Sequence, residues 1–324
     1  MILITGGLGF VGANTAQALL DLGESCVLTR HNNDYIPAFL ADYLDRQVFI
    51  EPVDVTDYLA LTGLGKKYPI SGIVHLTTGS MQAGRGSSAL ELAKDLENTI
   101  HSIATVVQAA HDWQVRRVSI AGAPVIYNGV TTLPWRDDQP LPLTAAFPME
   151  AAKKCGEIVA SYLGLYAQVE CIEIRLAAMY GPNYNPARSS LVGRLVHAAV
   201  KGKDPDLGSI RFGSVYAADS GDQCYIKDAA RGIALLQTAE KLNHHVYNVS
   251  SGRPTTNRDI VTAVQKIIPG FEVNLPEGHM PGLAPEPWYF DIARVQEETG
   301  YRPQFDIEAG VSDYIEWLRA GNER

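Results

Sequence analysis

A glycine-rich turn between an apolar strand and a helical pattern is the feature that most restricts the fold of this chain. Residues 2–4 are an apolar run, and residues 5–12 read Thr-Gly-Gly-Leu-Gly-Phe-Val-Gly before helical periodicity begins. In this context Gly6 permits a tight turn, Gly9 lets backbone N–H groups approach a pyrophosphate, and Gly12 lets the helix pack on the sheet. The spacing is GxxGxxG, one residue different from the simple dinucleotide fingerprint. The turn predicts a nucleotide-binding α/β domain.

Short apolar runs alternate with helix-period segments over the first half of the chain. This alternation predicts a Rossmann-like, doubly wound parallel sheet with helices on both faces, and a smaller C-terminal substrate-binding lobe. The expected strands are 2–4, 26–29, 48–50, 73–76, 118–121 and 169–174, and the expected helices are 11–22, 58–67, 90–111 and 150–166.

Beyond residue 180 the pattern changes, because Gly, Pro, Asn and Ser cluster in 181–186 and Pro and Gly recur in 275–287. We expect residues 1–180 to form the nucleotide-binding domain, with 215–250 returning to it. Residues 181–214 and 251–324 are expected to form mainly the substrate lobe. Thr256, with an acid three residues later, is suited to cap a helix. The helices expected here are 191–201, 228–239, 256–268 and 307–319.

Bulk properties exclude several classes of function. The net charge of −9 and pI near 5.4 argue against a nucleic-acid surface, which needs clustered Lys and Arg. No apolar run approaches the roughly 18 residues needed to span a membrane. Met1 lies directly before the first strand, so we expect no leader segment. The four cysteines lack CxxC spacing, so we expect reduced thiols, no metal site and a cytoplasmic protein.

Several further motifs are similar to those of the extended short-chain dehydrogenase/reductase superfamily, in its NAD-dependent epimerase/dehydratase group. The resemblance spans the full length and includes Asp54-Val55, His75-Leu76-Thr77-Thr78, Asn98, Tyr180-Gly181-Pro182, Tyr225-Ile226-Lys227-Asp228, and Asp291-Ile292 with Gly300-Tyr301-Arg302-Pro303. It implies a cofactor site made of Gly6, Gly9, Phe10, Val11, Gly12, Arg30, Asp54, Val55, Leu76, Thr77, Thr78, Asn98 and Lys153.

Arg30 ends the second expected strand, where NAD-preferring members usually carry an acid that binds the ribose 2′-hydroxyl. An arginine at this position would instead pair with a 2′-phosphate. The alternative is a solvated surface charge. The residue favours NADP as cofactor, with NAD as the second possibility.

The resemblance implies a catalytic tyrosine and serine that this sequence lacks. Met149 occupies the tyrosine position four residues before Lys153, and Ala123 occupies the serine position. None of the 15 tyrosines has a lysine four residues downstream. A thioether cannot transfer a proton. Lys153 can still hold the nicotinamide ribose, so the sequence predicts an intact cofactor site with a non-standard active site.

Other side chains are candidates for the missing proton donor, although a structural role is the simpler interpretation of each. Tyr127 is the strongest candidate, because the resemblance places it near the cofactor. Glu150 adjoins Met149 in the sequence. The remaining candidates lie at the mouth of the fourth expected strand and are Thr77, Thr78 and Ser80.

The substrate lobe lacks the residues with which sugar-nucleotide members bind a diphosphate. Ala178 stands where the resemblance implies an asparagine, and neither 221–222 nor 279–282 contains the implied arginines, which leaves Arg211 as a substitute. We therefore expect a small-molecule substrate with less charge than a nucleotide sugar. The expected pocket residues are Ser80, Met81, Ala123, Val125, Met149, Ala178 and Met179.

Three functions remain open at this stage: an NAD(P)-dependent oxidoreductase with an unusual proton path, a non-redox lyase or isomerase, and a silent NADP-binding sensor or scaffold protein. The resemblance also implies a homodimer through helices 90–111 and 150–166. Apolar residues beyond those that the sheet requires support this interface, namely Ile100, Ile103, Val107, Ile158 and Val159.

Overall fold

A seven-stranded parallel sheet forms the centre of the molecule in a computed structural model that describes residues 1–77, 87–185, 190–208, 210, 214–282 and 286–322. The order β3-β2-β1-β4-β5-β6-β9 puts a switch point between β1 and β4, from which successive strands are added on either side. Ligands of such sheets bind at the carboxyl ends of the strands at this point. The strands are β1 (Ile2–Thr5), β2 (Cys26–Arg30), β3 (Val48–Pro52), β4 (Gly72–His75), β5 (Arg117–Gly122), β6 (Glu170–Leu176) and β9 (Val246–Val249).

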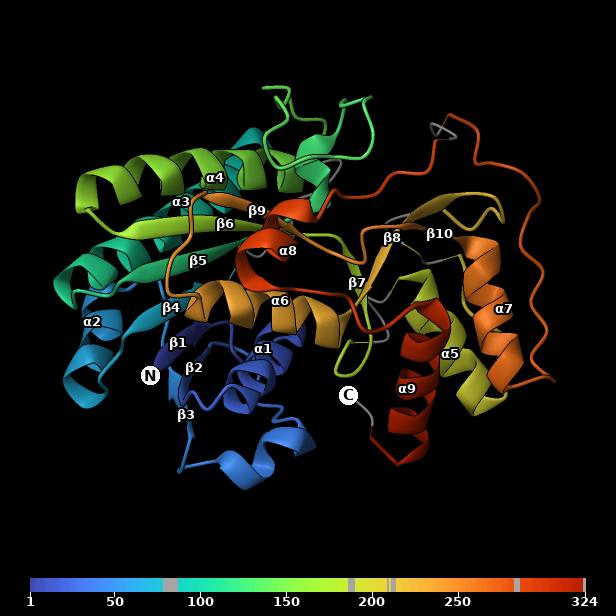
Figure 1. The fold of residues 1–324 in the computed structure, drawn as a ribbon, viewed down its shortest axis with the longest axis horizontal. Coiled ribbons are helices and arrows are strands. Elements are labelled where there is room, and N and C mark those ends of the chain that lie inside the picture. The colour runs from blue at the N-terminus through green and yellow to red at the C-terminus, as the bar shows by residue number, and fades with distance from the viewer. Residues whose placement is uncertain (78–86, 186–189, 209, 211–213, 283–285, 323–324) are drawn as a thin grey trace.

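Helices cover both faces of this sheet, which confirms the predicted doubly wound fold. The α1 helix (Phe10–Asp21) packs beside α6 (Ile226–Thr238) on one face. The other face carries α2 (Tyr58–Lys67), α3 (Ala89–Asp112) and α4 (Pro148–Ala167), with α3 against α4 (Figure 1). Each face buries its own apolar cluster, because strands of a parallel sheet are covered on both sides.

The smaller lobe surrounds a three-stranded sheet of β7 (Ala178–Tyr180), β8 (Ser220–Tyr225) and β10 (Pro254–Thr256). Thr256 and Asp259 form the capping box expected for α7, which confirms that helix start. The helices α5 (Leu191–Lys201), α7 (Asn257–Ile267) and α9 (Ile307–Arg319) pack together around a separate core, and Figure 1 shows them at the end of the molecule remote from α2.

The chain crosses between the two lobes more often than the predicted boundaries suggest. Within 215–250, β9 completes the large sheet and α6 packs on its face, whereas β8 pairs with β7 and β10. Within 251–324, α8 (Ala293–Thr299) packs on α6 and β9 of the large unit. The reason is that β6 needs a neighbour at its outer edge, and β9 supplies it in parallel register.

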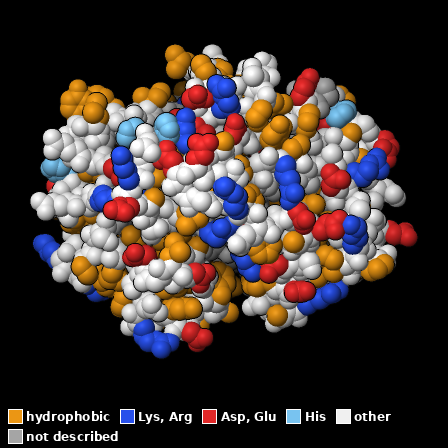
Figure 2. All heavy atoms as spheres, in the orientation of Figure 1, with side chains coloured by type: hydrophobic (Ala, Val, Ile, Leu, Met, Phe, Trp, Pro, Cys, Tyr) orange, Lys and Arg blue, Asp and Glu red, His pale blue; other side chains and the backbone are white. Residues whose placement is uncertain are grey.

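The surface is mixed in charge. Acidic and basic side chains are interspersed over the face seen in Figure 2. Within the described ranges, no helix is both long and apolar enough to cross a membrane. All four cysteines are free, and Cys26, Cys171 and Cys224 are buried.

Candidate active site

The glycine turn joins β1 to α1 in a conformation that side chains would prevent. Gly6 has a φ of +67°, which L residues rarely adopt. A Cβ on Gly12 would lie 2.4 Å from the carbonyl oxygen of Gly6, so only glycine lets α1 come this close to the turn. Asn33 donates from Nδ2 to the carbonyl oxygen of Leu8 at 2.6 Å, which places the loop after β2 beside the turn.

The amino end of α1 has the properties of an anion site. Gly9 caps the helix without a side-chain hydrogen bond, and the first turn contains no acidic residue. The first N–H groups of a helix lack intrahelical partners and lie at the positive end of its dipole. Gly9, Phe10 and Val11 therefore fit the pyrophosphate of a dinucleotide.

A buried histidine ties the end of β4 to this turn. Thr5 Oγ1 accepts hydrogen bonds from the N–H groups of Leu76 and Thr77, so its own proton goes to His75 Nδ1 at 2.8 Å. His75 Nε2 then carries the hydrogen and faces Ser102 Oγ at 3.4 Å. Burial lowers the pKa of His75 to about 3, so the ring is neutral and positions Leu76 and Thr77.

The residues that the resemblance assigns to the adenosine half of a dinucleotide follow the ends of β2 and β3. Asp54 is exposed, and hydrogen bonds from the N–H and hydroxyl of Thr56 lower the pKa of its carboxyl group. Val55 is buried, with its carbonyl oxygen accepting from Thr105 Oγ1 at 2.6 Å. Arg30 forms an ion pair with Asp34, whose side chain is mostly exposed.

The predicted reacting centre lies between α4 and the end of β5. Met149 is half-buried in the first turn of α4, and Ala123 follows β5. Lys153 stands one turn after Met149, and its Nζ donates to the carbonyl oxygen of Ala121 at 2.5 Å. Burial lowers the pKa of the Lys153 ammonium group. Asn98 is half-buried on α3, next to Thr99, whereas Thr78, Ser80 and Met81 lie outside the described residues.

The contacts of Tyr127, the strongest predicted candidate for the missing proton donor, argue against that role. Its hydroxyl accepts from Arg175 Nη1 at 2.6 Å and lies 2.9 Å from Asn248 Oδ1. The ring is fully buried and stacks on Trp135 with centroids 5.1 Å apart. Burial raises the pKa of this phenol to about 12, which makes it a poor acid. Tyr127 is a structural residue in this arrangement.

Glu150 likewise faces away from the predicted reacting centre. Its carboxylate accepts from Lys154 Nζ at 2.7 Å, from Asn128 Nδ2 at 3.0 Å and from the N–H of Ala146 at 2.9 Å. These donors lower its pKa although the group is buried. A helix turns roughly 100° per residue, so a residue next to Met149 in the sequence points elsewhere. Glu150 anchors the loop before α4.

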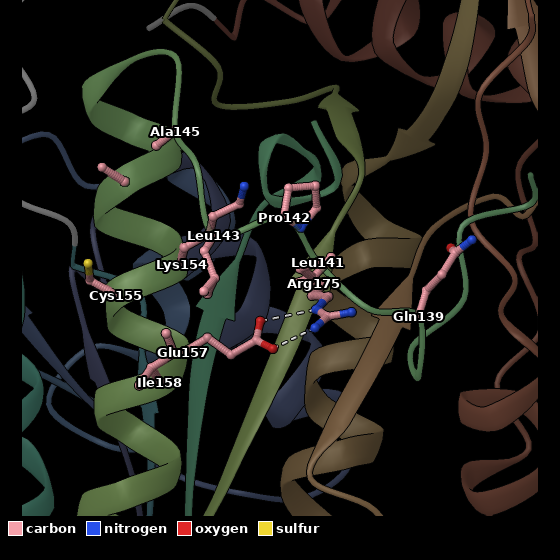
Figure 3. Close-up of a pocket in the computed structure, with 11 residues that line it drawn as sticks. Gln139, Leu141, Pro142, Leu143, Ala145, Lys154, Cys155, Glu157, Ile158 and Arg175 are labelled. Carbon is pink, nitrogen blue, oxygen red and sulfur yellow. Dashed lines mark hydrogen bonds and ion pairs between the residues drawn. The ribbon is translucent and has the colours of Figure 1, made fainter. Parts of the chain in front are cut away.

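A cavity of about 380 Å³ lies between α4, the loop of residues 139–145 and β6 (Figure 3). Lys154, Cys155 and Ile158 line it from the helix, and they lie opposite Met149 at ~100° per residue. The cavity is separate from the predicted reacting centre. At its inner wall Arg175 donates from Nε to Glu157 Oε2 at 3.1 Å and from Nη2 to Oε1 at 2.5 Å.

Behind this ion pair is a carboxyl group that sequence reasoning missed. Glu173 is 5% exposed on β6 and lines a small pocket together with Lys153 and Thr77. Burial, reinforced by the charge of Glu157, raises its pKa to about 8. The available signal was Glu173 between Ile172 and Ile174 in the run 169–174, because a strand buried on both faces does not normally contain a carboxylate there.

On the substrate side, Ala178 and Met179 lie half-buried on β7, and Val125 lies half-buried in the short 3₁₀ helix Pro124–Tyr127. Two buried acids hold this region together. Asp222 accepts from Ser251 Oγ at 2.6 Å and from the N–H of Phe290 at 3.1 Å. Asp219 lies 2.9 Å from His279 Nδ1. Arg211 lies outside the described residues.

Solved structures of low sequence identity share this fold. UDP-glucose 4-epimerase from Thermotoga maritima, solved with UDP-glucose, superposes with a TM-score of 0.80, 19% identity and coverage of 99% of each chain. UDP-glucuronic acid 4-epimerase from Bacillus cereus, solved with NAD, gives a TM-score of 0.77, 20% identity and the same coverage.

Sequence comparisons extend the relationship. UDP-glucuronate 4-epimerase 2 from Arabidopsis thaliana is 25% identical over 342 residues, which cover 98% of this chain and 75% of the plant protein. UDP-glucose 4-epimerase from Mycolicibacterium smegmatis is 24% identical and covers 98% of both chains. The sequence profile of the NAD dependent epimerase/dehydratase family matches residues 2–250, which is most of the chain. The chain therefore belongs to the NAD dependent epimerase/dehydratase family.

Proposed function

We propose that this protein is a nicotinamide-dependent enzyme that oxidises a secondary alcohol or reduces a ketone in a non-standard active site. The observation that carries the proposal is the placement of Lys153 one turn after Met149, on the same side of α4 as the end of β4. The glycine turn, Asp54 and the His75 network fit the rest of a dinucleotide. Hydride exchange is the chemistry that a bound nicotinamide supplies.

Residues of the chain bind the separate parts of the cofactor and surround the substrate oxygen. The amino end of α1 binds pyrophosphate, Asp54 accepts from the adenine amino group, and Lys153 donates to the nicotinamide ribose. Met149 and Ala123 offer no proton and no hydroxyl to the substrate oxygen. Loss of a general acid costs about 10²–10⁴ in rate, so turnover requires another proton source or a substrate that needs less assistance.

We propose a substrate that is smaller or less charged than a nucleotide sugar. The relatives named above act on UDP-sugars, and their diphosphate needs cationic partners. Here Asp222, fully buried and held by Ser251 and Phe290, stands beside Gly221 where the resemblance implies an arginine. Asp219, with its partner His279, adds a second carboxylate to the same region. Both carboxylates are buried, and residues 219–222 contain no cation in place of the implied arginine, which disfavours a dianion.

A substrate screen tests this proposal. Nicotinamide absorbance is followed with a panel of ketones, secondary alcohols and UDP-sugars. We expect turnover with an uncharged carbonyl or alcohol and none with UDP-glucose or UDP-glucuronate. Epimerisation of a UDP-sugar at rates ordinary for such enzymes would overturn the substrate proposal while leaving the cofactor site in place.

Restoring the missing pair tests the active-site assignment. Met149→Tyr with Ala123→Ser places a phenol and a hydroxyl near Lys153, whose charge lowers the phenol pKa. We expect ketone reduction to rise by about 10²–10⁴. Lys153→Ala in the same background serves as the control and is expected to lose the gain and to weaken cofactor binding.

The absence of both proton-handling side chains favours two alternatives: a non-redox lyase or isomerase, and a silent protein that binds the cofactor without turnover. Under either alternative the double variant gains no hydride transfer, and it loses any native activity. A lyase or isomerase keeps turnover in Lys153→Ala, whereas a silent binder shows no turnover in any variant.

Cofactor choice is proposed to favour NADP because of Arg30. Its partner Asp34 is mostly exposed, so a 2′-phosphate can displace that carboxylate. Arg30→Asp is expected to weaken NADP binding by roughly 1–3 kcal/mol in calorimetry, the scale of a charge-assisted contact. Arg46→Asp, at another exposed arginine of this domain, is the matched control. Equal NAD and NADP affinity in the unmodified protein would contradict the proposal.

A further inference from the structure

A small pocket lies beneath the predicted reacting centre, between α3, α4 and the sheet. Its volume is about 10 Å³, roughly the space of one water molecule. Thr77 stands at the end of β4 beside the glycine turn, and Glu173 lies on the neighbouring face of β6. Lys153 lines the same pocket from α4. The pocket therefore connects the proposed nicotinamide region with a buried carboxyl group.

Glu173 and Lys153 have complementary unused hydrogen-bonding capacity. Glu173 Oε2 is buried and has no hydrogen-bond partner among the residues that the structure describes. An ammonium group has three donors, and the hydrogen bond described for Lys153 Nζ, to the carbonyl oxygen of Ala121, uses one. Arg175 is engaged by Glu157 and Tyr127, so it does not satisfy Glu173. Lys153 is the remaining cation that lines this pocket.

We propose that Glu173 and Lys153 form a buried couple that stores and returns one proton, in place of the tyrosine that this active site lacks. The shared pocket and the unsatisfied Glu173 oxygen support the couple, whereas its use in turnover rests on the proposed function. Lys153 is the member that meets the substrate oxygen. Glu173 acts through Lys153 and is a positioning residue.

The proton balance of this couple is simple. When a ketone is reduced by a reduced nicotinamide dinucleotide, the Lys153 ammonium breaks one N–H bond and gives that proton to the substrate oxygen, forming an O–H bond. The protonated Glu173 carboxyl then gives its proton to the neutral amine. The couple ends as ammonium and carboxylate. Oxidation of an alcohol reverses both transfers.

The charged and titratable neighbours determine how this couple responds to pH. On α4, Glu157 faces Glu173 with the same charge, and Arg175 on β6 opposes it. His75 on β4 is neutral, with its pKa lowered to about 3. The side chains that α3 and β5 contribute to the pocket, which include Thr99 and Ile120, are uncharged. Burial and Glu157 thus raise the pKa of Glu173, and Lys153 limits the rise.

Carboxyl titration of the cofactor-free protein tests the couple directly. The protein is labelled with ¹³Cδ-glutamate and titrated by NMR, with the Glu173 resonance identified by its absence in Glu173→Gln. We expect a midpoint near pH 8, the raised pKa of this carboxyl. Lys153→Met is expected to move the midpoint upward, because the nearby positive charge is removed. Glu150→Gln, a buried carboxyl outside the pocket, is expected to leave the midpoint unchanged.

Two outcomes overturn the proposal: a Glu173 midpoint in the ordinary glutamate range, or a midpoint that Lys153→Met does not move. Should Glu173→Gln fail to fold, the infrared band of a protonated carboxyl provides the readout. That band is expected in the unmodified protein at neutral pH, and it should persist to higher pH in Lys153→Met. These measurements need no cofactor or substrate, so a failure of the proposed function is recognised separately.

A second readout separates this couple from a purely structural carboxyl. Calorimetry of NADP binding in buffers with different ionisation heats counts the protons exchanged on binding. We expect proton exchange near the Glu173 midpoint that disappears in Glu173→Gln and persists in Glu150→Gln. Equal proton counts in the protein and in Glu173→Gln would mean that Glu173 does not exchange its proton with the site.

Discussion

Single residues determine the geometry of the predicted cofactor site, and the clearest case is Gly12, which has no side chain. At Gly12 a Cβ would lie 2.4 Å from the carbonyl oxygen of Gly6 and 2.8 Å from the Cα of Gly7. Both contacts are with backbone, which cannot move aside without opening the turn. The role that the sequence predicted for Gly12, close packing of helix and turn, agrees with this geometry.

Gly12→Ala is expected to destabilise the protein by about 1–3 kcal/mol, the usual cost of overpacking. Urea unfolding measures the change. Gly63→Ala is the control, because Gly63 lies on an exposed position of α2 with open space around its Cα. That variant should gain roughly 0.5–1 kcal/mol from helix propensity. Equal stability of both variants would contradict this account of the turn.

His75 makes stability depend on pH. Burial lowers its pKa from 6.5 to about 3, so the unfolded chain binds this proton more readily than the folded chain. The contribution of His75 is therefore complete above pH 6.5 and is lost as pH falls toward 3, at up to about 1.4 kcal/mol per pH unit.

His75→Asn retains an acceptor for Thr5 and cannot take up this proton. We expect its free energy of unfolding to fall less steeply than that of the unmodified protein between pH 6 and 4, the window set by the shift of His75. Unfolding titrations at a series of pH values give both slopes. Parallel slopes would show that other groups control the acid limb.

The role of a site residue was predictable from the sequence only where a motif fixes the backbone around that residue. The glycines are of this kind. Tyr127 and Glu150 are not, because neither a family resemblance nor nearness in sequence to Met149 fixes the direction of a side chain. Their true partners, such as Asn248 for Tyr127, are contributed by distant segments. Glu173 escaped notice because no local pattern links it to Lys153.

At the scale of elements, α4 serves three different environments. Met149 and Lys153 face the predicted reacting centre, and Ala160 joins the core beneath the helix. Its outer side exposes a row of apolar residues, with exposed fractions of 59% for Ile158, 60% for Tyr162, 77% for Leu165 and 71% for Tyr166. Apolar residues at this helical spacing form a continuous stripe.

The homodimer stays a prediction that this apolar stripe supports, but the residues predicted for its interface need correction. Ile103 and Val107 on α3 are already buried within one chain, so they offer nothing to a partner. Ile158→Glu with Tyr162→Glu should convert a dimer of twice 35.2 kDa into a monomer in light scattering. Leu59→Glu on α2, at a position 79% exposed, should leave the dimer intact. A monomeric unmodified protein would refute the prediction.

Element bounds were predicted well where the periodic pattern was long. The expected 58–67 and 307–319 coincide with α2 and α9, and 90–111 falls within α3. The strands β7 and β10 were missed because three residues each give no alternation to detect. β8 was missed because its sequence, Ser-Gly-Asp-Gln-Cys-Tyr, is mostly polar, and its pairing with β7 and β10 determines it.

For the molecule as a whole, the two lobes are interleaved along the chain. The core on one face of the large sheet contains Ile172 and Ile174 from β6, Ile233 from α6 and Val295 from α8. No single cut separates the lobes without exposing this core. Residue 180 is therefore not a structural boundary between the lobes, although the change in composition there suggests one, because later segments contribute to the core of the large unit.

We expect the full chain to unfold in one calorimetric transition, because each lobe depends on segments that lie beyond the other. The fragment 1–180 should lack cooperative unfolding, since it leaves Ile172 and Ile174 uncovered. Circular dichroism and calorimetry measure both properties. Two well-separated transitions in the full chain, or a cooperatively folded fragment 1–180, would contradict the interleaved account.

The position of β9 also has a consequence for synthesis on the ribosome. β6 ends at Leu176 and its outer neighbour ends at Val249, so the last strand of the sheet emerges about 70 residues later. At roughly 5–20 residues per second, that delay is about 4–14 s. Throughout it the nascent chain presents the unpaired edge of β6, a template for wrong pairing. We therefore expect newly synthesised molecules of this protein to depend more on chaperones than its compact native state suggests.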